Sequence, residues 1–253
     1  MIVLVWSELG GEEALKKKWK KERRGKLTAL HYAAKFGNVD IAEFLLDMDA
    51  SLEIPTTRDR FVPLHMVAKD VDVKDRYKMT PLDYAILKDN ERAVLALLRN
   101  GANPNERDKN KRTPLLKACN FGSYKLVCLL LSFGADCSIT DKWRNSAFHM
   151  VAAHGRNEIL QLLIDHAGKH GVELLWTTNN EGKTPLELAV NGDHASTVNI
   201  ILSMKPPGSD SATFRLDKFL LHEAAAKGYL EVVKILIQLQ NQSSERTFPF
   251  KVL

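Results

Sequence analysis

Residues 113–119 read Thr113-Pro114-Leu115-Leu116-Lys117-Ala118-Cys119, and variants of this stretch recur along the chain. Thr is a good helix N-cap, because its hydroxyl accepts a hydrogen bond from an unpaired N–H of the first turn. Pro at the next position has no N–H to leave unpaired, so Thr-Pro predicts a helix start. Gly122, nine residues after Thr113, suits a left-handed helix end. The motif therefore predicts a short helix.

Seven copies of this motif are present, and their spacing is nearly regular. Their first residues fall at positions 28, 62, 80, 113, 146, 184 and 219, which gives steps of 34, 18, 33, 33, 38 and 35. A self-similar period of about 33 residues predicts a repeat architecture. In each unit an apolar stripe at helical spacing follows the motif and predicts a second helix. Its core residues include Val94, Leu97, Leu98, Leu126, Leu130, Leu131, Ile159, Leu163, Ile164, Val232, Leu236 and Ile237.

In motif and spacing the chain resembles the ankyrin-repeat family. The resemblance implies an all-α solenoid of stacked helix-turn-helix units with projecting β-turn or hairpin fingers and a concave binding face. Such repeats bury their apolar faces only by stacking on neighbours. We expect a basic lead-in over residues 1–24, the array over 25–240 and a tail over 241–253. The expected helix N-caps are Thr28, Thr80, Thr113 and Thr184.

The pattern breaks in two places. The step of 18 is 15 residues shorter than a step of 33, and alignment of the copies places all the missing residues between Asp70 and Val71. The copy at Val62 therefore lacks its second helix. A genuine loss, a spliced exon and an error in the gene model are all consistent with this gap. The step of 38 adds residues around 167–176, where we expect a longer connection, since insertions in repeats fall in loops. The last copy has apolar residues that need covering, and we expect the array to extend beyond Leu253.

The projecting fingers form a basic row with two aromatic residues. Aromatic and Arg side chains dominate many protein interfaces, so the row is a candidate contact for the acidic surface of a protein partner. The alternative is that these charges only solubilise the fingers and that Trp143 packs between neighbouring turns. The candidate residues are Arg76, Tyr77, Lys109, Lys111, Arg112, Lys142, Trp143 and Arg144.

Charge elsewhere is nearly balanced. The formal net charge is +5, and much of the excess lies in the run Lys16–Arg24. This run fits a nuclear-localisation or anionic-lipid signal, and equally a solvated helix that leads into the first repeat. We do not expect nucleic-acid binding, which would need more stacking aromatics and a larger excess of charge. The opening residues 1–6 are too few for a membrane span.

Histidine and cysteine residues indicate structure rather than chemistry. His31, His65, His149 and His222 hold the fourth motif position, where ankyrin repeats use His for hydrogen bonds within and between repeats. Three cysteines without paired spacing favour neither a disulfide framework nor zinc, and indicate a reducing cytoplasm. We expect Cys119 and Cys128 in the core and Cys137 exposed.

The sequence carries no motif for an enzyme: it lacks G-x-S-x-G, a phosphate-binding loop and a dinucleotide motif. We therefore expect neither catalysis, cofactor, metal nor small-molecule ligand. The first functional hypothesis is a cytoplasmic adaptor that binds a protein through its concave face and fingers. The second follows from residues 28–46 and 73–103, which resemble the ankyrin arrays of TRPA-class transient receptor potential channels. That resemblance implies the cytosolic ankyrin region of a longer channel.

Overall fold

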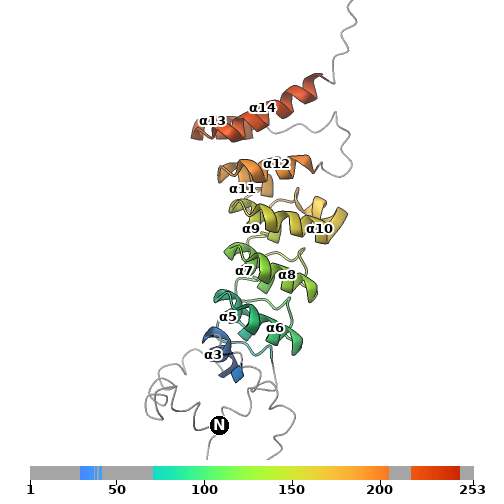
Figure 1. Cartoon of the computed structure of the whole chain (residues 1–253). Helices are drawn as coiled ribbons and strands as arrows, with labels where there is room; N and C mark the ends of the chain where they lie inside the picture. The colour runs from blue at the N-terminus through green and yellow to red at the C-terminus, as the bar shows by residue number, and fades with distance from the viewer. Residues whose placement is uncertain (1–28, 37, 39, 42–70, 205–217, 246–253) are drawn as a thin grey trace, which may run out of the picture. The chain divides into compact units, whose positions relative to one another are not determined.

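A computed structural model of the chain describes residues 29–36, 38, 40, 41, 71–204 and 218–245. These residues form helices and turns without a β-strand, as the all-α prediction requires. They divide into two units, one up to Lys109 and one from Asn110 onward. Figure 1 shows the helices in chain order.

The first unit contains α3, α5 and α6, and short local signals begin its helices. Thr80 is the N-cap of α5, where its side chain accepts from the amide of Asp83 and the Asp83 carboxylate accepts from the amide of Thr80. Asn90 is the N-cap of α6, and its side chain accepts from the amide of Ala93. The helices span Ala29–Phe36 (α3), Pro81–Leu87 (α5) and Glu91–Arg99 (α6).

In this unit α3 packs directly against α5. His31 Nε2 lies 2.9 Å from the carbonyl oxygen of Met79, and the His31 ring meets the Tyr84 ring edge-on at 5.5 Å. His149 makes the corresponding contact with the carbonyl of Lys183 in the next repeat, at 3.2 Å. The helices of the copies at 28 and 80 are therefore direct neighbours. The copy at Val62 and the predicted cap Thr28 lie outside the described residues.

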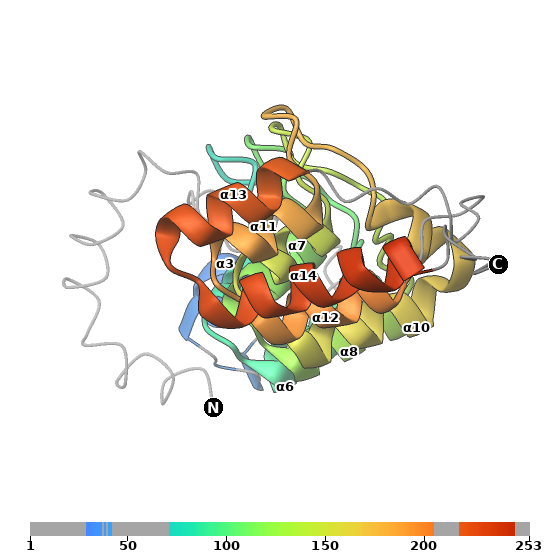
Figure 2. The same ribbon diagram turned by 90° about the horizontal axis from the view of Figure 1, so that it is seen from above.

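The second unit is a stack of helix pairs. The first helices α7, α9, α11 and α13 contact one another in sequence, and α8, α10, α12 and α14 do the same. Figure 2 shows these two rows seen along the stack. The helices span Pro114–Phe121 (α7), Tyr124–Ser132 (α8), Ala147–Ala153 (α9), Asn157–Leu174 (α10), Pro185–Asn191 (α11), Ala195–Ser203 (α12), Lys218–Lys227 (α13) and Leu230–Glu245 (α14).

Local chemistry explains where the first helices of this unit begin and end. Thr113 and Thr184 are N-caps that each accept the amide hydrogen bond three residues on, with Pro at the first helical position. Ser146 takes the same role for α9. Gly122 ends α7 with φ 82°, a left-handed value that Gly adopts without steric penalty.

The core lies between the two rows. The predicted apolar stripe is buried in α6, α8 and α10, and Val232 and Leu236 of α14 are buried as well. Ile237 was expected in the core and is 42% exposed, so that expectation is wrong. Within the described residues α14 contacts α12 and α13 and forms the last layer, which leaves its outer face uncovered there.

The inserted residues at the end of α10 form a kink and a second helical segment rather than a loop, which corrects the expected longer connection. Helix α10 consists of two helical segments that meet at Gly168, whose φ of 56° and ψ of −132° are not helical, and the second segment ends at Leu174. Leu174 and Leu175 are 9% and 0% exposed, and Gly171 leaves room for the Phe148 ring. Burial of these apolar side chains stabilises the extra turns, because each adds on the order of 1.5–3 kcal/mol when fully buried.

Candidate functional site

The fingers are turns that a buried side-chain oxygen holds closed. Asp141 Oδ1 accepts from the amides of Trp143 and Asn145, both at 2.9 Å, while the Asp141 amide donates to the Asn145 carbonyl at 3.0 Å. The Asp141 residue is only 3% exposed. A short acceptor side chain favours such a turn, because it reaches its own backbone a few residues on. The finger is thus a defined structure and presents Lys142, Trp143 and Arg144 outward.

The same turn recurs in other fingers. In the first unit Asp75 Oδ1 accepts from the amides two and four residues later, at 2.7 and 2.8 Å. In the second unit Asn179 Oδ1 accepts from the corresponding amides at 2.9 and 3.0 Å. Asn replaces Asp here because its amide oxygen is an acceptor of the same reach. These shared bonds explain why Asp or Asn stands at the start of these three fingers.

The fourth residue of each finger has a left-handed backbone. The φ angles are 60° at Lys78, 59° at Lys111, 63° at Arg144 and 73° at Gly182. A residue with a β-carbon pays roughly 1–2 kcal/mol for this conformation, whereas Gly does not. Sequence reasoning missed this feature, although the alignment of Lys78, Lys111 and Arg144 with Gly182 contains the signal. Three fingers thus carry a cation at a position that suits Gly.

Hydrogen bonds between neighbouring fingers fix their register in the second unit. The Lys142 amide donates to the Asn110 carbonyl at 2.9 Å, and the Asn180 amide donates to the Trp143 carbonyl at 2.9 Å. The Asn180 side-chain amide also donates to the Lys142 carbonyl at 3.2 Å. The tips over residues 110–112, 142–144 and 179–183 are therefore linked into one row, which we name the finger row.

Trp143 is the aromatic centre of the finger row. Its side chain lies beneath the Lys142 ammonium, 4.2 Å from the ring centroid, and beside the Arg112 guanidinium at 5.4 Å. The residue is 41% exposed. Cation–π contacts at exposed sites contribute about 0.5–1 kcal/mol each, so they orient the indole ring without removing it from solvent. Trp143 thus packs against its own and a neighbouring finger and still offers an accessible aromatic surface.

Tyr77 is the corresponding aromatic residue of the first unit and is 46% exposed. The Arg76 guanidinium lies 4.5 Å from the Tyr77 ring centroid and donates to its hydroxyl, and the Lys109 ammonium lies 5.4 Å from that centroid. The Lys109 amide donates to the Tyr77 carbonyl at 3.0 Å. Three predicted site residues therefore meet in the first unit, and the other five lie on the finger row.

The buried histidines join repeats. His149 lies 1% exposed between Ser146, whose Oγ is 2.8 Å from Nδ1, and the Lys183 carbonyl oxygen. Burial lowers the pKa of His149, and the Lys183 carbonyl and the Asp141 carboxylate oppose that shift. Burial lowers the pKa of His31 in the same way. Both rings are therefore neutral near pH 7. His65 lies outside the described residues, and His222 is exposed.

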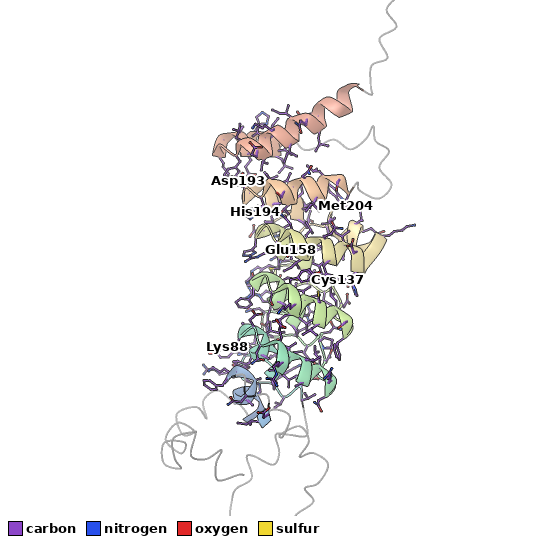
Figure 3. The ribbon with its side chains drawn as sticks, in the orientation of Figure 1. Lys88, Cys137, Glu158, Asp193, His194 and Met204 are labelled. Atoms are coloured by element: carbon purple, nitrogen blue, oxygen red, sulfur yellow. The ribbon has the colours of Figure 1, made fainter. Side chains whose placement is uncertain are left out.

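The cysteines differ from the expectation in two respects. Cys128 was expected in the core and is only half-buried. Cys119 is fully buried as predicted, and burial raises the pKa of its thiol. Cys137, labelled in Figure 3, is 8% exposed, so the expected exposure is wrong. Burial is also the main cause of the raised pKa of Cys137. Both thiols are therefore protonated and act as small apolar side chains.

No group of three or more His, Cys, Asp or Glu side chains in the described ranges could hold a metal ion. Among the same residues, none of the helices is both long and apolar enough to cross a bilayer.

Known proteins similar to this chain carry ankyrin repeats. The ankyrin-repeat family model matches in three copies, over residues 12–108, 62–141 and 115–213. A transient receptor potential cation channel subfamily A member 1 homolog from Caenorhabditis elegans is 33% identical over 87% of this chain and 21% of its own length. Ankyrin repeat domain-containing protein 63 from Mus musculus is 33% identical over 71% of this chain and 42% of its own length.

Inversin from Mus musculus is 29% identical over 87% of this chain and 19% of its own length. The chain thus spans less than half of each of these relatives. The solved ankyrin repeat domain of Bcl-3 superimposes with a TM-score of 0.66 at 22% identity, covering 85% of this chain and 86% of that domain. This likeness supports the fold. Ankyrin repeats are in general non-catalytic modules of protein–protein interaction, and this chain belongs to the ankyrin-repeat family.

Proposed function

We propose that the chain is a cytoplasmic protein-binding module that contacts an acidic partner through the finger row and the adjoining face of the first helices. The observation that carries the proposal is Trp143, which is 41% exposed and flanked by the cations of Lys142 and Arg112. Trp and Arg are enriched among the residues that dominate binding energy, and aromatic side chains offer large contact area at low conformational cost.

Charge supports an acidic partner over an apolar one. The finger row presents Lys111, Arg112, Lys142 and Arg144, and the Asp141 carboxylate in the same finger is buried beneath the turn. Only Glu181 places an exposed carboxylate on the row, where it pairs with Lys183 at 3.3 Å. A surface with this excess of cations accelerates encounter with acidic proteins and disfavours basic ones.

The test compares partner recovery by the full chain and by two variants of matched exposure. Trp143→Ala removes the proposed anchor, whereas Phe133→Ala removes an aromatic residue that is 37% exposed at the end of α8, away from the fingers. We expect Trp143→Ala to weaken binding of the recovered partner by about 30-fold or more, as hot-spot truncations do. Phe133→Ala should leave the affinity unchanged. Equal binding by both variants in calorimetry would reject the finger row as the contact.

A second candidate function is the ankyrin region of a TRPA-like cation channel. The similarity to a subfamily A member 1 homolog over 87% of this chain favours it. The test is to sequence the full-length transcript through Asp70-Val71 and past Leu253. A reading frame that continues into apolar stretches of about 20 residues would support the channel. A stop directly after Leu253 would reject it.

A further inference from the structure

Backbone strain at the fingers points to a role for particular side chains. Lys111 and Arg144 hold φ angles of 59° and 63°, and the equivalent position of the next finger is Gly182 at 73°. A β-carbon in this conformation is strained, so Gly would be the more stable residue at all three positions. Residues kept in strained conformations indicate a function that the strained residue serves.

Space around the turn does not explain the choice of residue. A β-carbon built at Gly182 meets no heavy atom within 4 Å. The fingers are open at this position, so packing neither requires Gly nor demands a large side chain there. What Lys111 and Arg144 share, and Gly182 lacks, is an exposed cationic side chain. Within the finger row, charge is therefore the property that distinguishes the two strained residues, Lys111 and Arg144, from Gly182.

The geometry brings the two cations into register. The Lys142 amide donates to the Asn110 carbonyl, and this bond links the finger that carries Lys111 to the finger that carries Arg144. The Trp143 ring lies on the same row, against the Lys142 ammonium and the Arg112 guanidinium. Two cations on neighbouring fingers, with an aromatic surface on the same row, match an extended segment that carries carboxylates at intervals.

We propose that Lys111 and Arg144 hold an extended acidic segment of a protein partner across the finger row, and that this contact is the reason for the strained backbone. This inference rests on the proposed function and names the partner's chemistry. Nucleic acid would also present anions, but Trp143 is the one aromatic residue among the described tips of the finger row, and stacking of successive bases uses several. An acidic peptide fits the surface better.

The test uses the full chain and a short peptide of alternating glutamate and serine, with a glutamine-and-serine peptide as the uncharged control. In the double variant Lys111→Gly with Arg144→Gly we expect the affinity for the glutamate peptide to fall by about tenfold, as the loss of two exposed ion pairs implies. The same variant should melt about 2–8 °C higher, because relief of the left-handed strain, less the roughly 0.5–1 kcal/mol of extra chain entropy of each Gly, leaves about 1–2 kcal/mol for the two positions together. Stability and binding then change in opposite directions.

Two matched variants separate charge from strain. Lys111→Ala with Arg144→Ala keeps the β-carbon strain and removes the charge, so it should bind as weakly as the Gly variant without melting higher. Gly182→Lys adds a cation at an open position, and should bind the glutamate peptide more tightly and melt lower.

Several outcomes would overturn the inference. These are no binding of the glutamate peptide by the native chain, unchanged binding by the Gly variant, or a lower melting temperature of that variant, which would show that the side chains stabilise the turn. Binding of single-stranded poly-dT in preference to the peptide would assign the surface to nucleic acid. Loss of the natural partner on Trp143→Ala, together with any of these results, would leave the proposed function standing while this inference fails.

Discussion

Replacing Asp141 by Ala tests whether one buried carboxylate builds the finger. The carboxylate accepts from the amides of Trp143 and Asn145, each at 2.9 Å, and lies 3% exposed. Hydrogen bonds to a charged acceptor contribute about 1.5–3 kcal/mol each. Loss of two such bonds should lower the free energy of opening the finger by about 3–6 kcal/mol, and water that enters the turn would bring the loss toward the lower end of this range.

The matched control is Asp141→Asn, because the chain already uses Asn179 at this place in the next finger. Asn179 accepts from the two equivalent amides at 2.9 and 3.0 Å. We expect Asp141→Asn to keep both bonds with a neutral acceptor, at about 0.5–1.5 kcal/mol each, and so to lose about half as much as Asp141→Ala. The assay is amide hydrogen exchange at Trp143 and Asn145, which reports local opening. Equal loss of protection in the Ala and Asn variants, or none in either, would refute the account of the turn.

Three further predictions concern stability. Burial lowers the pKa of His149, so the unfolded chain binds a proton at this residue more readily than the folded chain does. The urea midpoint of unfolding should therefore stay constant above the ordinary pKa of 6.5 and fall as the pH drops from 6.5 through the lowered pKa of the folded state. In His149→Gln the midpoint should vary less with pH. Leu163→Ala should cost about 2–5 kcal/mol, because Leu163 is fully buried, whereas Ile237→Ala, 42% exposed, should cost less than about 1 kcal/mol in the same urea titration. Gly122→Ala should destabilise by about 1–2 kcal/mol, since φ is 82°, and its β-carbon would also displace the Arg156 side chain; a melting temperature equal to that of the native chain would contradict this.

The helices were predictable from the sequence because their signals are local. Thr80, Thr113 and Thr184 with the following Pro start helices by hydrogen bonds within one turn, which depend little on the rest of the fold. The finger row was also predictable, because a period of about 33 residues places equivalent turns side by side. Periodicity thus identified the architecture and the candidate surface together.

Features that depend on neighbouring layers were not predictable. Cys137 lies close to a turn in sequence, yet a neighbouring part of the fold buries it. Direct packing of α3 on α5 joins copies that the sequence separates by the copy at Val62. The second helical segment after the kink at Gly168 depends on apolar burial of Leu174 and Leu175 rather than on a local signal. In each case tertiary contacts outweighed the local pattern.

The left-handed finger residues form an intermediate case. Lys78, Lys111 and Arg144 align with Gly182, so the substitution of Gly by a cation was visible in the sequence. The strain at these residues was not visible in the sequence, because basic residues are common in turns and their φ angles are known only from the structure. The strain becomes evidence only with the backbone geometry.

The central claim, that the finger row is the binding surface, is tested most directly by mapping amide chemical shifts of the full chain as the glutamate peptide is added. The account predicts that the shifts concentrate at residues 110–112 and 142–144 and include the indole N–H of Trp143, while the amides of α8 and α12 stay in place. Shifts centred on α8 and α12, with residues 110–112 and 142–144 unchanged, would contradict it.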